Sequence, residues 1–155
     1  GHNKGGWFLM RLAERMPDVT FLVAGKADEL VQKPENLHLL GVISEGQELA
    51  RLYRQAKVSV IVSKRETFSM PCAESLCCGT PVIGFRAGAP EQISLPEYSE
   101  FIEYSDLDGL EALVRKWLER KDLSAEQISQ AAHRAYSVDT MVRNCLDIYG
   151  RLKWN

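Results

Sequence analysis

The sequence has few of the residues that support metal or redox chemistry. Its 155 residues include four cysteines and three histidines, and no two cysteines form a C-x-x-C pair. Because zinc and iron–sulfur sites use cysteine and histidine at short regular spacings, we expect no metal site. Three of the cysteines lie close together, at Cys72, Cys77 and Cys78. We interpret them as small, buried, reduced side chains in a cytoplasmic protein.

The sequence also lacks a strong charge bias and a long apolar run. The formal net charge is −2, which argues against a nucleic acid or an anionic membrane as partner. No apolar run approaches the roughly 18 residues of a membrane span, and no secretory signal is visible. Hydrophobic residues make up 45% and charged residues 26%, which is typical of an ordinary globular protein. The length suits one domain, which we place at 1–155.

Several common catalytic motifs are missing as well. No G-x-G-x-x-G follows a predicted strand, and neither G-x-x-x-x-G-K-[ST] nor G-x-S-x-G occurs. The sequence therefore argues against dinucleotide binding, a P-loop and a hydrolase with a nucleophile elbow.

Short β-rich segments alternate with amphipathic helical patterns along most of the chain. Strands are predicted at 20–24, 37–41, 58–62, 81–85 and 100–104, and helices at 6–16, 46–56, 71–78, 106–120, 124–135 and 137–152. This alternation predicts an α/β fold, namely a Rossmann-like parallel sheet with helices on both faces, followed by C-terminal helices. Ligands of such sheets bind beyond the carboxyl ends of the strands.

The stretch 63–91 combines a strand end, a loop, a short helix and another strand. Pro71 suits the first helical position, and Gly79 is the expected left-handed stop. The free N–H groups of about 68–72 would then point out of the loop, where a helix start attracts anions such as phosphate.

Two carboxylates flank this anion site, with the spacing E-x7-E. Glu66 lies in the loop before the helix, and Glu74 is placed in its first turn. Carboxylates accept hydrogen bonds from sugar hydroxyls, so the pair together with the helix start suggests a nucleotide-sugar site. The structural alternative is that Glu74 only complements the helix dipole and that Glu66 is an ordinary loop acid.

The segment ETFSMPCAESLCCGTPVIGFRAGAPEQI resembles the donor-site signature of retaining glycosyltransferases of the GT-B fold, of the group 1 type. It departs from that signature at Thr67 and Ser69, where glycines are usual, and at Ala89. The matching positions are Glu66, Phe68, Pro71, Glu74, Cys78, Gly79, Thr80, Pro81, Val82, Ile83, Gly88 and Glu91.

The resemblance implies a role for each matching residue. Glu74 would bind the ribose hydroxyls, and Glu66 would hold the donor sugar and favour an oxocarbenium-like transition state. The backbone N–H groups of Phe68, Ser69 and Met70 would bind the phosphates. Lys4, in a glycine-rich helix start, would stabilise the leaving diphosphate.

Further implications concern the base and the donor. Gly41, Val42 and Ile43 lie where the family holds the nucleobase, although an ordinary strand-to-helix turn is the alternative. Glu91 matches the signature but could simply cap the segment that follows. The donor would be a UDP- or GDP-linked hexose, transferred with retention, and no metal or other cofactor would be needed.

The resemblance extends over nearly the whole chain, through Lys4-Gly5-Gly6, 42–57 and 136–152. It implies the C-terminal, donor-binding half of a two-domain enzyme. The N-terminal half would bind the acceptor (a glycan, lipid or small molecule) and make any peripheral membrane contact. We expect the chain alone to bind donor weakly and to catalyse little or no transfer, in a pathway such as polysaccharide or glycoconjugate synthesis.

Two alternatives remain at this point. A nucleotide-sugar epimerase shares the general fold but lacks the E-x7-E loop. A non-catalytic interaction domain could keep the fold and lose turnover, and the replaced glycines at Thr67 and Ser69 are the features that would support it.

Overall fold

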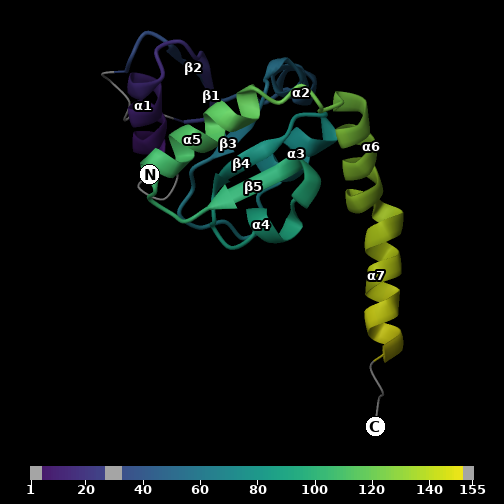
Figure 1. Cartoon of the computed structure of the whole chain (residues 1–155). Coiled ribbons are helices and arrows are strands. Elements are labelled where there is room, and N and C mark those ends of the chain that lie inside the picture. The colour runs from purple at the N-terminus through teal and green to yellow at the C-terminus, as the bar shows by residue number, and fades with distance from the viewer. Residues whose placement is uncertain (1–4, 27–32, 152–155) are drawn as a thin grey trace.

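The structure is a computed structural model, which describes residues 5–26 and 33–151. It confirms the predicted alternation of helices and strands (Figure 1). The elements are α1 (Gly6–Arg15), β1 (Phe21–Ala24), β2 (Leu37–Gly41), α2 (Gly46–Gln55), β3 (Ser59–Ile61), α3 (Met70–Cys77), β4 (Val82–Phe85), α4 (Pro90–Ile93), a 3-10 turn η1 (Pro96–Tyr98), β5 (Ser99–Ile102), α5 (Leu107–Leu118), α6 (Ala125–Tyr136) and α7 (Val138–Arg151). The sequence analysis missed only the short α4 and η1.

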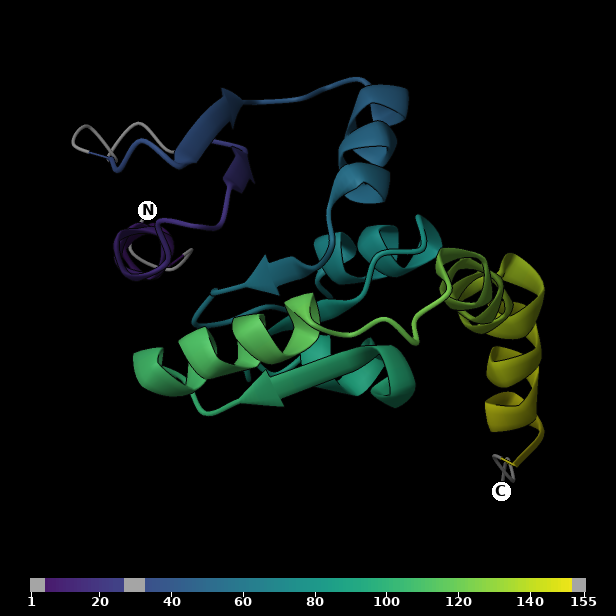
Figure 2. The same ribbon diagram turned by 45° about the horizontal axis from the view of Figure 1, so that its top comes forward.

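All described strand pairs are parallel, but they form two sheets. β1 pairs with β2, and β3, β4 and β5 form a separate sheet in that order. Figure 2 shows the β1–β2 pair set apart from the other three strands. The two sheets nevertheless share one apolar core, in which Phe21 and Leu37 join Ile83 and Phe85. Apolar packing is non-directional, so it continues where backbone hydrogen bonding stops.

Helices cover both faces of the three-stranded sheet, as predicted. Ile83 and Phe85 of β4 belong to the core that contains residues of α1 and α5. Val82, which points to the opposite face because side chains alternate along a strand, packs with Leu76 of α3 and Ile128 of α6. The buried strand therefore positions α3, whose first residues lie at the candidate site.

One side chain ties the end of α1 to the chain before β2. The Nδ2 group of Asn36 donates to the carbonyl oxygens of Ala13, Met16 and Val19, at 3.0, 2.9 and 2.8 Å. Ala13 lies in the last turn of α1, and Met16 and Val19 follow the helix, where carbonyls no longer have the regular helical partners. The carbonyls of Ala13 and Met16 also accept from the amides of Met16 and Val19. Asn36 thus ends α1 and anchors β2 to it.

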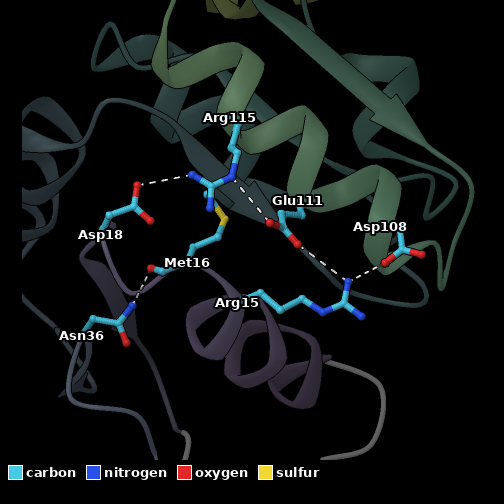
Figure 3. A network of polar contacts seen from close by, with 7 residues as sticks. All are labelled: Arg15, Met16, Asp18, Asn36, Asp108, Glu111 and Arg115. Atoms are coloured by element: carbon cyan, nitrogen blue, oxygen red, sulfur yellow. Dashed lines mark hydrogen bonds and ion pairs between the residues drawn. The ribbon is translucent and has the colours of Figure 1, made fainter.

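Ion pairs connect α1 to α5 at the surface (Figure 3). Arg15 pairs with Asp108 and Glu111, and Arg115 pairs with Glu111 and Asp18. Because these side chains are largely exposed, each pair contributes little on its own, and the apolar contacts beneath them dominate.

Three predicted helix starts are confirmed by capping hydrogen bonds. Asp106 accepts from the Gly109 amide at the start of α5. The Ser124 hydroxyl accepts from the Gln127 amide at the start of α6. Ser137 accepts from the Thr140 amide at the start of α7.

Helix α7 extends away from the rest of the molecule (Figure 1). It contains no buried residue, and its exposed apolar side chains are Val138, Met141, Val142, Leu146, Ile148 and Tyr149. Within 5–26 and 33–151, no helix is both long and apolar enough to cross a membrane.

Candidate functional site

Two loops meet at the carboxyl edge of the three-stranded sheet. The loop 62–69 follows β3, and the loop 86–89 follows β4. The amide of Glu66 donates to the carbonyl of Ala87 at 2.9 Å, and Glu66 and Gly88 form a parallel bridge. Since β3 and β4 are parallel neighbours, both loops begin at the edge where α/β folds bind ligands. Glu66 therefore lies where the sequence predicted it.

The carboxylate of Glu91, in the first turn of α4, holds the second of these loops. It accepts from the amides of Ala87 and Gly88, at 3.1 and 2.9 Å. Partial burial favours the protonated form, but the backbone hydrogen bonds and the charge of Arg86 outweigh it and hold the pKa of Glu91 below its usual value. The carboxylate of Glu91 therefore holds the loop that precedes it, whereas the alternative considered for Glu91 was a cap of the segment that follows.

The start of α3 presents free backbone amides. Among the described residues, the amides of Phe68, Ser69 and Met70 donate to no acceptor. The predicted set was too long: Pro71 has no N–H group, and the Cys72 amide donates to the carbonyl of Ser69 at 3.0 Å. Three consecutive amides therefore remain for a ligand at a helix N-terminus.

Ser69 is the N-cap residue of α3 and has an unusual conformation. Its backbone is left-handed, with φ 68° and ψ 68°, and its side chain makes no capping hydrogen bond. The residue is only 4% exposed, whereas the neighbouring Phe68 and Met70 are 49% and 56% exposed. A glycine would adopt this backbone without strain, which explains why glycine is usual in the signature that the segment resembles.

Glu74 lies in the second turn of α3, and the prediction of a first-turn position was wrong. The helix begins one residue earlier than expected, at Met70, because Ser69 takes the cap position. Glu74 is half-buried, like Glu66. In the second turn the helix dipole stabilises a carboxylate less than in the first, because the effect falls off beyond the first turn. The dipole alone is therefore a weaker explanation for Glu74.

The phenol of Tyr53, on α2, donates to Oε2 of Glu74 at 3.4 Å. Burial, together with the charge of Glu74, raises the pKa of Tyr53, so the phenol remains a proton donor at neutral pH. The hydroxyl of Thr80 in turn donates to the carbonyl of Tyr53. The sequence did not predict this role of Tyr53, because Tyr53 and Glu74 are 21 positions apart and no local pattern indicates their contact.

The predicted Lys4 lies outside the described residues. Its neighbour Gly5, the N-cap of α1, has φ 71° and lies against Val62, where the Glu66 loop begins. A Cβ atom on Gly5 would come within 2.0 Å of the Val62 carbonyl oxygen. Only glycine therefore fits at this contact between the start of α1 and the candidate site.

The predicted base-binding residues follow β2. Gly41 is exposed with φ 71°, and its carbonyl accepts from the Gly25 amide at 2.7 Å. Val42 is 65% exposed, and Ile43 is half-buried. No described contact joins this loop directly to Glu74; the connection runs through α2, which carries Tyr53.

A surface hollow of about 600 Å³ lies at the other end of α3. Its lining residues are Arg54, Cys77, Cys78, Ala125, Glu126, Ser129 and His133, and neither Glu66 nor Glu74 is among them. Burial raises the pKa of the Cys77 and Cys78 thiols, which makes them poor nucleophiles. This hollow is therefore separate from the candidate site.

Comparison with known proteins identifies the family. The model of the family described as "Glycosyl transferases group 1" matches residues 8–134. The chain belongs to this glycosyltransferase family. The match includes both loops, Glu66 and Glu74, and it agrees with the resemblance found in the sequence.

Several members of the family are similar to this chain. D-inositol 3-phosphate glycosyltransferase of Xylanimonas cellulosilytica is 30% identical over 166 residues, which cover 96% of this chain and 39% of that protein. MMP alpha-(1->4)-mannosyltransferase of Mycolicibacterium hassiacum is 36% identical over 75 residues, which cover 47% of this chain and 18% of that protein.

The fold matches that of solved GT-B glycosyltransferases. HepE of Anabaena in complex with UDP superposes with a TM-score of 0.81 at 18% sequence identity, over 98% of this chain and 46% of HepE. The chain therefore spans less than half the length of these relatives.

Proposed function

We propose that this glycosyltransferase chain binds the nucleotide-sugar donor, a UDP- or GDP-linked hexose, for transfer with retention at the anomeric carbon. The observation that carries the proposal is the arrangement at the sheet edge. Three amides at the start of α3 have no acceptor among the described residues, and they lie in sequence between Glu66 and Glu74. The loop of Glu66 is hydrogen-bonded to the neighbouring loop, and Glu74 accepts from Tyr53. The structure of HepE in complex with UDP supports the same class of ligand.

Each group would contribute a distinct interaction. The amides of Phe68, Ser69 and Met70, together with the positive end of α3, would bind the diphosphate as it leaves with extra negative charge. Glu74 would accept hydrogen bonds from the ribose hydroxyls, with Tyr53 holding one of its oxygens. Glu66 would bind the donor sugar, and its charge would stabilise positive charge that develops at the anomeric carbon.

Lys4 and the loop after β2 would complete the site. Lys4 would add a positive charge to the diphosphate, and the contact of Gly5 with Val62 supports a place near the Glu66 loop. Gly41, Val42 and Ile43 would contact the base. The acceptor would be bound by a further domain of the whole enzyme, which is the role expected for an N-terminal half, and no metal would be required.

Calorimetry with UDP and GDP tests the proposal. We expect the chain to bind one of the two diphosphates, with EDTA leaving the affinity unchanged. Glu74→Ala removes charge-assisted hydrogen bonds worth about 1.5–3 kcal/mol and should weaken binding about tenfold or more. Glu119→Ala, an exposed acid at the end of α5, is the matched control and should bind like the wild type.

The same experiment separates the alternatives. A folded wild-type chain that binds neither diphosphate would refute the donor site and favour the interaction domain. Glu66→Ala should affect UDP-glucose more than UDP, since Glu66 is assigned to the sugar. Transfer should be negligible for the chain alone, and appreciable turnover would contradict the two-domain reading.

A further inference from the structure

Ser69 carries two energetic costs at once. A left-handed backbone is unfavourable for any residue with a Cβ atom. The Ser69 hydroxyl is also buried, with no hydrogen-bond partner among the described residues. A buried hydroxyl without a partner destabilises the folded state, because it loses its hydrogen bonds to water.

The combination is unique to Ser69 within the described part of the chain. Ser105 is the other non-glycine residue with positive φ, but it is exposed, so water satisfies its hydroxyl. Ser99 is the other residue with an unpartnered buried hydroxyl, and it lies at the start of a regular strand. Glycine at position 69 would remove both costs, so the fold itself gives no reason for serine there.

The position of Ser69 suggests what offsets these costs. It is the N-cap of α3 and lies between Phe68 and Met70, whose apolar side chains are exposed. The amides of these two neighbours also have no acceptor in the described part of the chain. A serine hydroxyl offers one donor and rotates about a single bond. Unfavourable local features of this kind occur most often at ligand-binding sites, where interactions with the bound ligand offset their energetic cost.

We propose that the Ser69 hydroxyl is itself a ligand of the donor diphosphate. On binding, it rotates and donates a hydrogen bond to a phosphate oxygen beside those from the three amides. This inference rests on the proposed donor site. It makes Ser69 a specificity-determining residue that replaces the usual glycine and adds a side-chain contact to the three backbone amides at the start of α3.

Calorimetry with UDP and uridine tests the inference, using Ser69→Ala and Ser69→Gly. Alanine removes the hydroxyl and keeps the backbone strain, whereas glycine removes both. A hydrogen bond to a charged phosphate is strong, so both variants should bind UDP about tenfold more weakly than the wild type. Uridine, which lacks phosphate, should bind all three proteins equally. The midpoint of thermal unfolding should be no lower in either variant.

Ser99→Ala is the control, because it removes the other orphaned hydroxyl at the opposite edge of the sheet. It should bind UDP like the wild type. If Ser69→Ala binds UDP with wild-type affinity, the proposed role of Ser69 is wrong, but the donor site stands. The same holds if its affinities for UDP and uridine fall equally. A wild-type chain that does not bind UDP or GDP would overturn the donor site as well.

Discussion

The hydrogen bonds of Glu91 offer a direct test of how the site is held together. Glu91→Ala removes a carboxylate that accepts from the amides of Ala87 and Gly88, at 3.1 and 2.9 Å. Hydrogen bonds to a charged group contribute about 1.5–3 kcal/mol each, but partial exposure of this loop weakens both. We therefore expect a total loss of about 2 kcal/mol. For a chain of this size, that corresponds to a decrease of roughly 4–8 °C in the midpoint of thermal unfolding.

The effect should depend on pH. Because the pKa of Glu91 is lowered in the folded state, its stabilisation is present above the unfolded pKa of about 4.3 and is lost as pH falls through the folded pKa. Thermal unfolding followed by circular dichroism should thus separate wild type and Glu91→Ala at pH 7. The difference should shrink steadily below about pH 4.

Two further variants make this measurement specific. Glu91→Gln keeps an acceptor oxygen but loses the charge, so its stability should fall between those of wild type and Glu91→Ala. Glu97→Ala removes a nearby exposed acid and should change the midpoint little. UDP binding should weaken in Glu91→Ala, because Glu91 holds the loop whose Ala87 carbonyl accepts a hydrogen bond from the Glu66 amide. An unchanged midpoint at pH 7 would refute the reasoning.

Three other predictions concern the body of the domain. Asn36→Ala should lower the free energy of unfolding by about 2 kcal/mol, because two N–H hydrogens serve three carbonyls and their contributions do not add fully. Asn36→Asp should lower it further, since a carboxylate would face the same carbonyls. Denaturant unfolding of the three proteins would show this order. Gly5→Ala should destabilise the fold by at least about 2 kcal/mol through backbone strain and the clash with Val62. Burial raises the pKa of Cys72 to about 12, so a thiol reagent at pH 8 should modify the exposed Cys145 first and Cys72 only on unfolding.

Local patterns predicted the elements well because the signals are themselves local. Asp106 and Ser124 cap helices from within the same turn, and Gly79 ends α3 with φ 87°, as its lack of a Cβ atom allows. The place of Glu66 after a buried strand also followed from chain order. By contrast, the start of α3 was misplaced by one residue, which moved Glu74 out of the first turn.

The sequence by itself determined the order of helices and strands, the loop with its two acids and the family to which the chain belongs. Only the tertiary structure decided that the strands form two sheets, that Tyr53 holds Glu74, that Glu91 pins the neighbouring loop and that the Ser69 hydroxyl is buried without a partner. The physical reason is the range of the interactions. Caps and periodicity act within a few residues, whereas burial and cross-chain hydrogen bonds depend on which distant segments the core brings together.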